Sequence, residues 1–344
     1  MNLGVLLPAI GAILAFIFAI ALLDQWRERR HGYQLVWAVG MFFFAVGNAC
    51  EALGAASGWS DTLYRTWYLT GAVSTAGWLG LGTALLLGKT RFGYAYGALI
   101  VLGGLLAFVI SRKYTDAGSL PILVLIAALV FALAVLVETY FQNERWPRIA
   151  ALGVIAGTIA GAWFAFMPAL VGPLPSPAEI PSGIAMPGAA RTISFVMNIP
   201  GGFALVVGAL FSAYIFMPKK RVLDYSLDPG QKGDQFLFNV FLAIVAIPVN
   251  FVVSLPGAIV ATVRGQVHSR VPATLLIGVG GFLVSSVDLL SRLGSTDLYQ
   301  VGKFVALVLI FLGFLVSIEV FREIRIPFTG RVLRGARTER STTP

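Results

Sequence analysis

The chain is built from runs of about twenty apolar residues, separated by short segments that carry most of its charges. A run of this length, folded as a helix, crosses a hydrocarbon core of ~30 Å. Only 12% of the 344 residues are charged, against roughly a quarter in an average soluble domain. Backbone in lipid must satisfy its own hydrogen bonds, which leaves helices or closed barrels. Barrel strands alternate apolar and polar residues. Because these runs are continuous, we predict an all-α, polytopic integral membrane helix bundle.

Nine runs are continuous enough to be read as spans. They cover 3–23, 33–56, 67–87, 94–111, 120–141, 149–171, 193–217, 272–290 and 301–321. A tenth segment, 236–263, is also apolar enough to cross. Prolines and polar residues interrupt it, namely Pro248, Pro256, Asn239, Asn250 and Ser254.

The distribution of positive charge decides between nine and ten spans. If 236–263 does not cross, 19 of the 25 Lys and Arg residues lie on one side and 6 on the other; if it crosses, the division is 13 to 12. Cytoplasmic loops are enriched in Lys and Arg. We therefore predict about nine transmembrane helices plus a re-entrant or interfacial helical hairpin at 236–263, with ten spans as the alternative.

The same rule predicts the orientation. No positive charge precedes the first run, and Arg27, Arg29 and Arg30 follow it. A cleavable signal peptide has the reverse arrangement. We expect an uncleaved first span in the cell inner (plasma) membrane of a bacterium, with the N-terminus outside and the C-terminus in the cytoplasm.

The predicted organisation has four parts. They are a seven-helix membrane bundle (1–217), a cytoplasmic loop with the hairpin (218–271), two C-terminal transmembrane helices (272–321) and a basic cytoplasmic tail (322–344). The longest outer loop, 172–190, is rich in Pro and Gly and is expected to form an ordered cap. The net charge of +9 lies between and after the spans, which favours anionic inner-leaflet lipids over nucleic acid as the partner. A membrane-protein partner or a homo-oligomer is a further possibility.

Glu51 is the residue that most invites a chemical role. It lies late in the second run, where a carboxylate costs a few kcal/mol unless it is paired, hydrated or protonated. Arg65 and Arg191 are the predicted partners. One interpretation is a polar or proton-linked pocket; the other is an ion pair that fixes helix packing. The candidate pocket comprises Asn48, Glu51, Arg65, Thr70, Ser74 and Arg191.

Glycines recur at helical spacing in two runs. Gly153, Gly157 and Gly161 share one face of the sixth run, and the third run contains Gly77, Gly80 and Gly82. Small residues let helix backbones approach closely. We expect packing within the chain, with homodimerisation as the alternative. Pro200 is expected to kink the seventh run.

Several motifs are missing from the sequence. The single Cys50 excludes an internal disulfide, and both histidines lie in basic loops. The sequence contains no Walker A motif, dinucleotide fingerprint or HExxH motif. We therefore predict no catalytic residues, no cofactor and no metal site, and a protein that is not an enzyme.

Two resemblances can be read from longer stretches. The segment 37–91 resembles the seven-helix membrane sensor module of bacterial histidine kinases, which carries a similar Glu late in its second span. The resemblance lies in the stretches WAVGMFFFAVGNACEALG and YRTWYLTGAVSTAGWLGLGTALLLGKTR. The chain has no kinase or other output domain after the spans. A second resemblance is to uncharacterised multi-spanning bacterial membrane proteins. It lies in the stretches RTISFVMNIPGGFALVVGALFSAY, VHSRVPATLLIGVGGFLVSSVDLLSRLG and LIFLGFLVSIEVF. This second resemblance implies that 224–263 is an insertion, and it implies no activity.

Together these features predict a non-enzymatic multi-pass protein. It would be a sensory or ligand-binding-like bundle, or an accessory (scaffold) subunit of a membrane complex. The alternative is a small-molecule or lipid transporter that uses the polar site around Glu51.

Overall fold

The computed structural model describes residues 3–141, 144–177, 179–228, 230, 233–264, 266–268, 270–292, 298–317, 324–325, 327, 329 and 332–334. Within these residues, ten helical segments are long and apolar enough to cross a membrane. The predicted class, a multi-pass helical membrane protein, is therefore confirmed. Most of the predicted tail, 322–344, lies outside the described residues.

The elements follow the predicted runs closely. In chain order they are α1 (Leu3–Arg29), α2 (Gly32–Ser57), α3 (Asp61–Trp67), the π-helix η1 (Tyr68–Ser74), α4 (Thr75–Leu86), α5 (Phe92–Ser111), the short 3-10 helix η2 (Thr115–Ala117), α6 (Leu120–Tyr140), α7 (Trp146–Phe166), the short 3-10 helix η3 (Gly183–Ala185), α8 (Gly188–Phe216), α9 (Gly233–Val263), α10 (Arg270–Arg292), α11 (Tyr299–Val316), β1 (Ile324–Arg325) and β2 (Val332–Arg334). The two strands form a short antiparallel pair, and α3, η1 and α4 form one continuous span.

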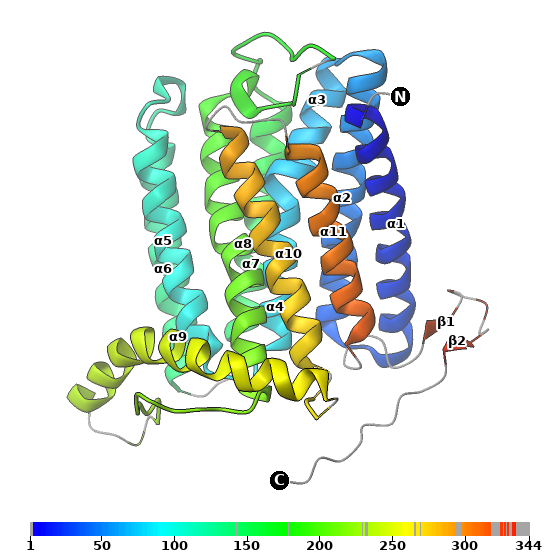
Figure 1. Ribbon diagram of the computed structural model, residues 1–344. Coiled ribbons are helices and arrows are strands. Elements are labelled where there is room, and N and C mark those ends of the chain that lie inside the picture. The colour runs from blue at the N-terminus through cyan, green and yellow to red at the C-terminus, as the bar shows by residue number, and fades with distance from the viewer. Residues whose placement is uncertain are drawn as a thin grey trace.

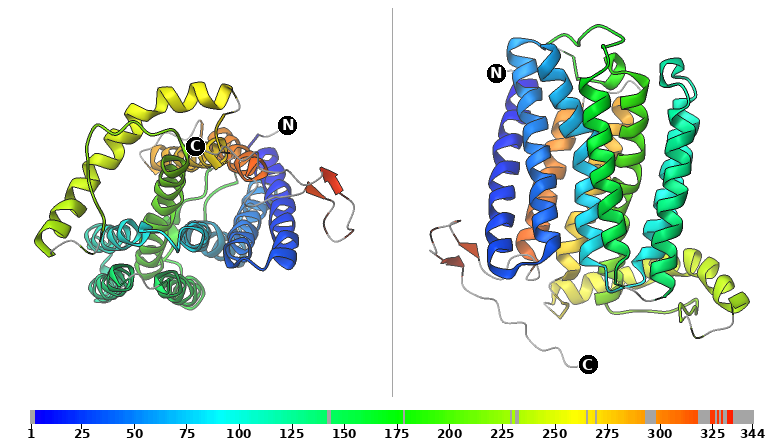
Figure 2. Two further views of the ribbon diagram at one scale, coloured as in Figure 1. Left: turned by 90° about the horizontal axis from the view of Figure 1, so that it is seen from below. Right: turned by 180° about the vertical axis from the view of Figure 1, so that it is seen from behind.

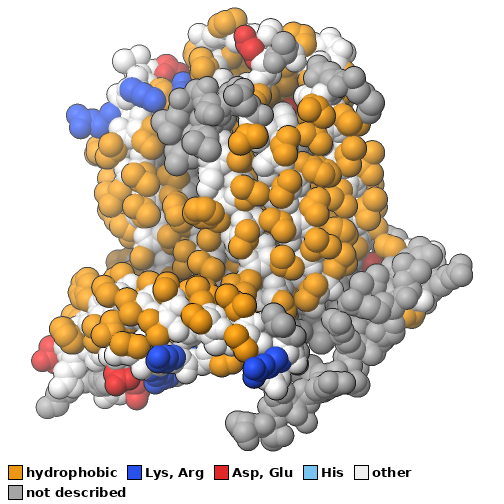
Figure 3. All heavy atoms as spheres, viewed as in Figure 1, with side chains coloured by type: hydrophobic (Ala, Val, Ile, Leu, Met, Phe, Trp, Pro, Cys, Tyr) orange, Lys and Arg blue, Asp and Glu red, His pale blue; other side chains and the backbone are white. Residues whose placement is uncertain are grey.

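The long apolar helices run side by side, except for α9. In Figure 1, α9 lies across one end of the bundle at a steep angle to the other helices. We call this the α9 end, and the opposite end, which carries the N-terminus, the N-terminal end. Hydrophobic side chains cover the wall of the bundle between the two ends, with Lys and Arg near the ends (Figure 3).

Two core clusters hold the bundle together, and α8 contributes to both. The first joins the α3–η1–α4 span to α5, α6, α7 and α8. The second joins α1, α2, α4 and α8 to the two C-terminal helices, through Phe18, Trp37, Leu79, Leu205, Ile277 and Phe314. The rings of Trp37 and Phe314 lie 4.6 Å apart. The last two helices therefore share a core with the first helices and complete the same bundle.

The helices α4 and α8 cross with their backbones in contact. A Cβ atom added to Gly80 would lie 2.4 Å from the Gly201 carbonyl oxygen, and one added to Gly201 would lie 2.4 Å from the Ala76 carbonyl oxygen. In the sixth span, Gly157 and Gly161 face Met197 and Val73 of the same chain. The prediction of packing within the chain is confirmed.

The π-helix η1 lies beside this crossing and is tied to α8. The Ala72 carbonyl accepts hydrogen bonds from the Ser194 hydroxyl (2.5 Å) and from the Asn198 amide. A π-turn leaves backbone groups displaced from the usual ladder, so side chains of α8 satisfy this one. Pro200 stays inside the continuous helix α8.

The helix α9 corrects one prediction. It is a single helix of 31 residues and not a helical hairpin, and it bends into an arc when seen from below (Figure 2, left). A proline removes one helical hydrogen bond and kinks a helix without reversing it. The residues between Pro248 and Pro256 offer no turn sequence, so the chain curves through both prolines and does not fold back.

Candidate functional site around Glu51

Glu51 is buried where α2 approaches the N-terminal end of the bundle. It lies six residues before the end of α2, roughly 9 Å along the helix axis, and only 1% of its surface is exposed. One carboxylate oxygen accepts a hydrogen bond from Gln300 Nε2 at 2.5 Å, and the other lies 2.5 Å from Lys303 Nζ. Both partners come from the start of α11, three residues apart, so they project from one face of that helix.

The Lys303 ammonium is enclosed almost as fully as the carboxylate. Its side chain is 13% exposed, and Nζ lies 5.7 Å from the ring centres of both Phe44 and Tyr299. Aromatic faces attract a cation in this position. A buried ion pair gains Coulomb energy against a large desolvation cost, so each charge depends on the other. The cluster therefore links α2 to α11 through charge.

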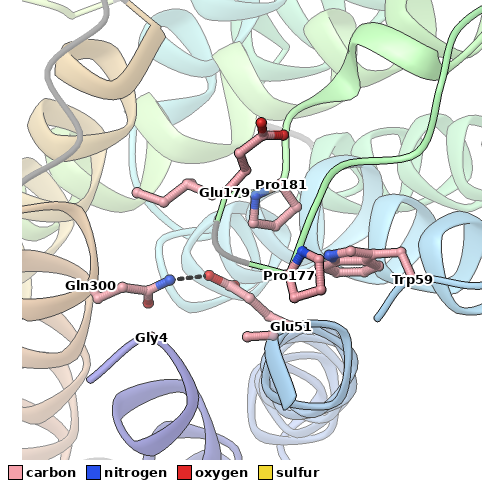
Figure 4. Close-up of a pocket in the computed structure, with 9 residues that line it drawn as sticks. Gly4, Glu51, Trp59, Pro177, Glu179, Pro181 and Gln300 are labelled. Carbon is pink, nitrogen blue, oxygen red and sulfur yellow. Dashed lines mark hydrogen bonds between the residues drawn. The ribbon is translucent and has the colours of Figure 1, made fainter. Parts of the chain in front are cut away.

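Two small cavities adjoin the cluster. The first has a volume of about 60 Å³, room for a few water molecules, and the close-up in Figure 4 shows Glu51 and Gln300 beneath the Pro-rich loop. Its lining is Gly4, Glu51, Ala55, Trp59, Pro177, Glu179, Ile180, Pro181 and Gln300. The second has a volume of about 10 Å³, room for about one water, and is lined by Leu7, Pro8, Gly11, Phe44, Asn48, Gln300, Lys303, Phe304 and Leu307.

The loop that roofs the first cavity is ordered by hydrogen bonds, as expected of a cap. Val171 N donates to the Ala185 carbonyl at 2.9 Å, and the Tyr64 hydroxyl donates to the Ser182 carbonyl. Tyr64 belongs to α3 and is fully buried. The roof is therefore tied to α3.

Of the predicted pocket residues, Asn48 and Glu51 lie in this site. Asn48 is one turn before Glu51 on α2, lines the second cavity, and donates from Nδ2 to the Phe44 carbonyl at 2.9 Å. Asn48 therefore lies beside the cluster, in a cavity that Lys303 also lines.

The predicted pairing of Glu51 with Arg65 is wrong. Arg65 is buried and bonds to Asp61, with Nε 2.8 Å from Oδ2. Its Nη1 donates to the carbonyls of Ala165 and Pro168 at 2.5 and 2.8 Å. The guanidinium thus joins α3 to the end of α7.

The other three predicted residues also have partners elsewhere. The Arg191 guanidinium lies 4.1 Å over the ring of Tyr114. The Thr70 hydroxyl donates to the Thr66 carbonyl at 2.7 Å, and the Ser74 hydroxyl donates to the Leu69 carbonyl at 2.8 Å. Both hydroxyls satisfy backbone groups of their own span. The structure therefore does not gather the six residues into one pocket.

Gln300 and Lys303 are the site residues that the sequence interpretation missed. Lys303 stands at the edge of the run 301–321, where a positive charge is typical of a loop at the end of a span. One signal was available: a lysine inside the first helical turns of an apolar span needs a buried anion or a route to water. Glu51 is the carboxylate predicted at matching depth, so depth alone could have paired them.

The site has no features of a metal centre. In the part of the chain that the structure describes, no three His, Cys, Asp or Glu side chains are grouped to hold a metal ion.

Comparisons with protein-family models, with curated proteins and with solved structures found no match to this chain. The site must therefore be interpreted from its own geometry.

Proposed function

We propose that the chain is a non-enzymatic, multi-pass membrane protein that serves as an accessory or scaffold subunit of a membrane assembly. It has nine spans, and α9 lies in the membrane–water interface at the cytoplasmic face. The observation that carries this proposal is α9 itself, a long apolar helix set across the end of the bundle with most of its surface uncovered.

The exposure of α9 is concentrated in large apolar side chains. Phe238 and Phe241 are 67% and 69% exposed. The others are Leu237, Ile244, Val245, Val252, Ile259 and Val260. Exposed apolar surface on this scale marks contact with lipid or with another protein. A helix held flat at one end of a bundle presents that surface to partners in the plane of the membrane.

The distribution of positive charge supports the orientation. The turns that connect spans at the α9 end, together with the helix ends beside them, carry Arg27, Arg29, Arg30, Lys89, Arg91, Arg145 and Arg148. Cytoplasmic loops are enriched in such residues. The α9 end is accordingly proposed to face the cytoplasm of a cell with an inner (plasma) membrane, and the Glu51 end to face outside.

The packing of the bundle favours a scaffold over a transporter. The cavities beside Glu51 hold only a few water molecules, and the carboxylate already has a lysine partner. Transport of a small molecule or lipid is a second candidate, favoured by one observation: Glu51 itself lines the cavity beneath the loop. A sensory role of the bundle would use the same opening.

A pair of matched variants tests the scaffold role. Phe238→Ser/Phe241→Ser removes two exposed rings, three residues apart, from α9. Val130→Ser/Leu133→Ser removes two similarly exposed and similarly spaced side chains from α6. After purification in mild detergent from the native membrane, the unaltered chain should carry other chains in fixed ratio, and only the α9 variant should lose them.

Quantitative mass spectrometry of the purified material provides the readout, and membrane yield provides the control for folding. An unaltered chain that elutes alone would contradict the proposal. So would equal loss of partners from the α6 and α9 variants.

A further inference from the structure

Three basic segments meet at one corner of the α9 end. Lys219, Lys220 and Arg221 follow the end of α8, Arg264 follows the end of α9, and Arg270 begins α10. The three helix ends are joined by a buried cluster that contains Tyr214 of α8, Met217 directly after it, Ala258 of α9 and Val271 of α10. Segments that are far apart in sequence therefore present their cations around one small apolar centre, which we call the basic corner.

The segment 219–228, which we call the strap, is fixed along α9 by side-chain hydrogen bonds. The Ser254 hydroxyl accepts from Lys220 N at 2.9 Å. Asn250 Oδ1 accepts from the backbone of Val222 and Leu223 at 2.8 and 3.0 Å, and Asn250 Nδ2 donates to the Leu223 carbonyl at 2.7 Å. Farther along, Asn239 Oδ1 accepts from Ser226 N at 3.2 Å.

These bonds account for the three polar residues that interrupt the apolar sequence of α9, Asn239, Asn250 and Ser254. Asn250 and Ser254 are almost completely buried, and each satisfies backbone groups of the strap. The strap covers the polar stripe of α9, and the side chains of Lys219, Lys220 and Arg221 remain exposed. The cations are thereby held at a fixed position relative to α9 and do not lie on a free loop.

Aromatic rings lie beneath the cations at the corner. The Arg270 guanidinium lies 4.4 Å over the Phe216 ring, and Lys219 Nζ lies 5.6 Å from the Tyr214 ring centre. The His268 ring lies 4.9 Å from that of Phe216. Tyrosine, here Tyr214, is enriched at the level of lipid headgroups. The corner thus combines a cationic rim with an aromatic base.

Apolar side chains continue from the corner along α9. Ile259 and Val260 are 58% and 49% exposed and lie within two turns of Arg264. In Figure 3, hydrophobic side chains cover α9, and Lys and Arg lie along its lower edge. A soluble anion would need only the cations. A ligand that uses both surfaces carries a negative group and an apolar tail.

We propose that the basic corner binds an anionic phospholipid, with the phosphate against the cations of the strap and the acyl chains against α9. This inference rests on the proposed position of α9 in the membrane–water interface at the cytoplasmic face. It adds the class of lipid that would bind there. A bound lipid would bridge the strap, α9 and α10 and so hold the arc of α9 against the bundle.

The chain offers a closely matched control. Arg112 and Lys113 form an exposed basic pair directly after α5, at the opposite end, and Lys113 Nζ lies 5.3 Å from the ring centre of Tyr114. Lys219→Gln/Lys220→Gln and Arg112→Gln/Lys113→Gln thus remove the same charge from similar positions. The control pair lacks a strap, and the apolar helix beside it, α5, runs along the bundle and not across its end (Figure 1).

The experiment titrates the purified full chain in detergent with fluorescent phosphatidylglycerol, with phosphatidylcholine as the neutral lipid. Each charge near an anionic surface contributes about a fivefold preference. We expect Lys219→Gln/Lys220→Gln to weaken phosphatidylglycerol binding roughly twentyfold, Arg112→Gln/Lys113→Gln to change it less than about twofold, and inorganic phosphate not to compete.

Equal losses in the two variants would overturn the proposal, because they would show attraction to net charge alone. Full competition by inorganic phosphate would reassign the corner to a soluble anion. Equal binding of phosphatidylcholine would remove the headgroup selectivity. Each failure leaves the scaffold role and the topology of α9 standing, since those are tested by co-purification and by labelling.

Discussion

Lys303→Met is expected to cost about 3–5 kcal/mol of folding stability, because it leaves the Glu51 carboxylate buried without its partner. The carboxylate is 1% exposed and its lysine 13% exposed, so water can compensate little of the loss. The measurement is thermal unfolding of the purified chain in detergent, monitored by size-exclusion chromatography after heating. A large fall in melting temperature is the expected result.

Variants of Glu51 distinguish the contribution of the Glu51–Lys303 ion pair to stability from the contribution of side-chain packing. Glu51→Gln/Lys303→Met removes both charges and keeps a hydrogen-bonding partner for Gln300, so it should recover most of the stability. Glu51→Gln alone should remain folded, because the amide oxygen can still accept from Lys303. Glu51→Lys should fail to insert stably, since two ammonium groups would meet at the site. Equal stability of Lys303→Met and the unaltered chain would contradict the account.

Gly201→Ala is expected to be the most damaging glycine-to-alanine substitution in the bundle. The added Cβ would lie 2.4 Å from the Ala76 carbonyl oxygen and 2.6 Å from the Gly77 backbone nitrogen. Backbone atoms cannot move aside as a flexible side chain can, so α4 and α8 would have to separate. Overpacking typically costs about 1–3 kcal/mol and occasionally more; we expect the upper part of that range, seen as a loss of folded yield.

The neighbouring residue provides the control. A Cβ added to Gly202 would meet nothing within 4 Å. Gly202→Ala should therefore be neutral or slightly stabilising, because alanine is favoured over glycine in a helix by about 1 kcal/mol. Equal folded yields of the two alanine variants would show that α4 and α8 do not cross in backbone contact.

The spans could be predicted from sequence because each is a local property. A continuous apolar run fixes helix and length together, and the runs agree with the helices to within a few residues at most ends. The behaviour of 236–263 could be predicted only in part. The charge distribution and the two prolines predict a hairpin, whereas Pro248 and Pro256 lie inside one curved helix, because a proline kinks a helix without reversing it.

The partner of Glu51 could not be predicted because the sequence of one apolar run does not determine which other helices pack against it. Arg65 is close to Glu51 in sequence, but it points to the end of α7. Lys303 is 252 positions away and becomes a neighbour only because α11 packs into the core of α1 and α2. Pairing by depth in the membrane would have been a better guide than pairing by distance along the chain.

The central claim is that α9 does not cross the membrane, and cysteine labelling tests it most directly. Cys50 is buried; in a Cys50→Ala background, single cysteines at Asp228 and Gln266 mark the two ends of α9, and Ser57→Cys marks the N-terminal end. A membrane-impermeant maleimide should label Ser57→Cys in intact cells, and Asp228→Cys and Gln266→Cys only after the membrane is opened. Labelling of Asp228→Cys and Gln266→Cys from opposite sides would make α9 a tenth span and contradict the account.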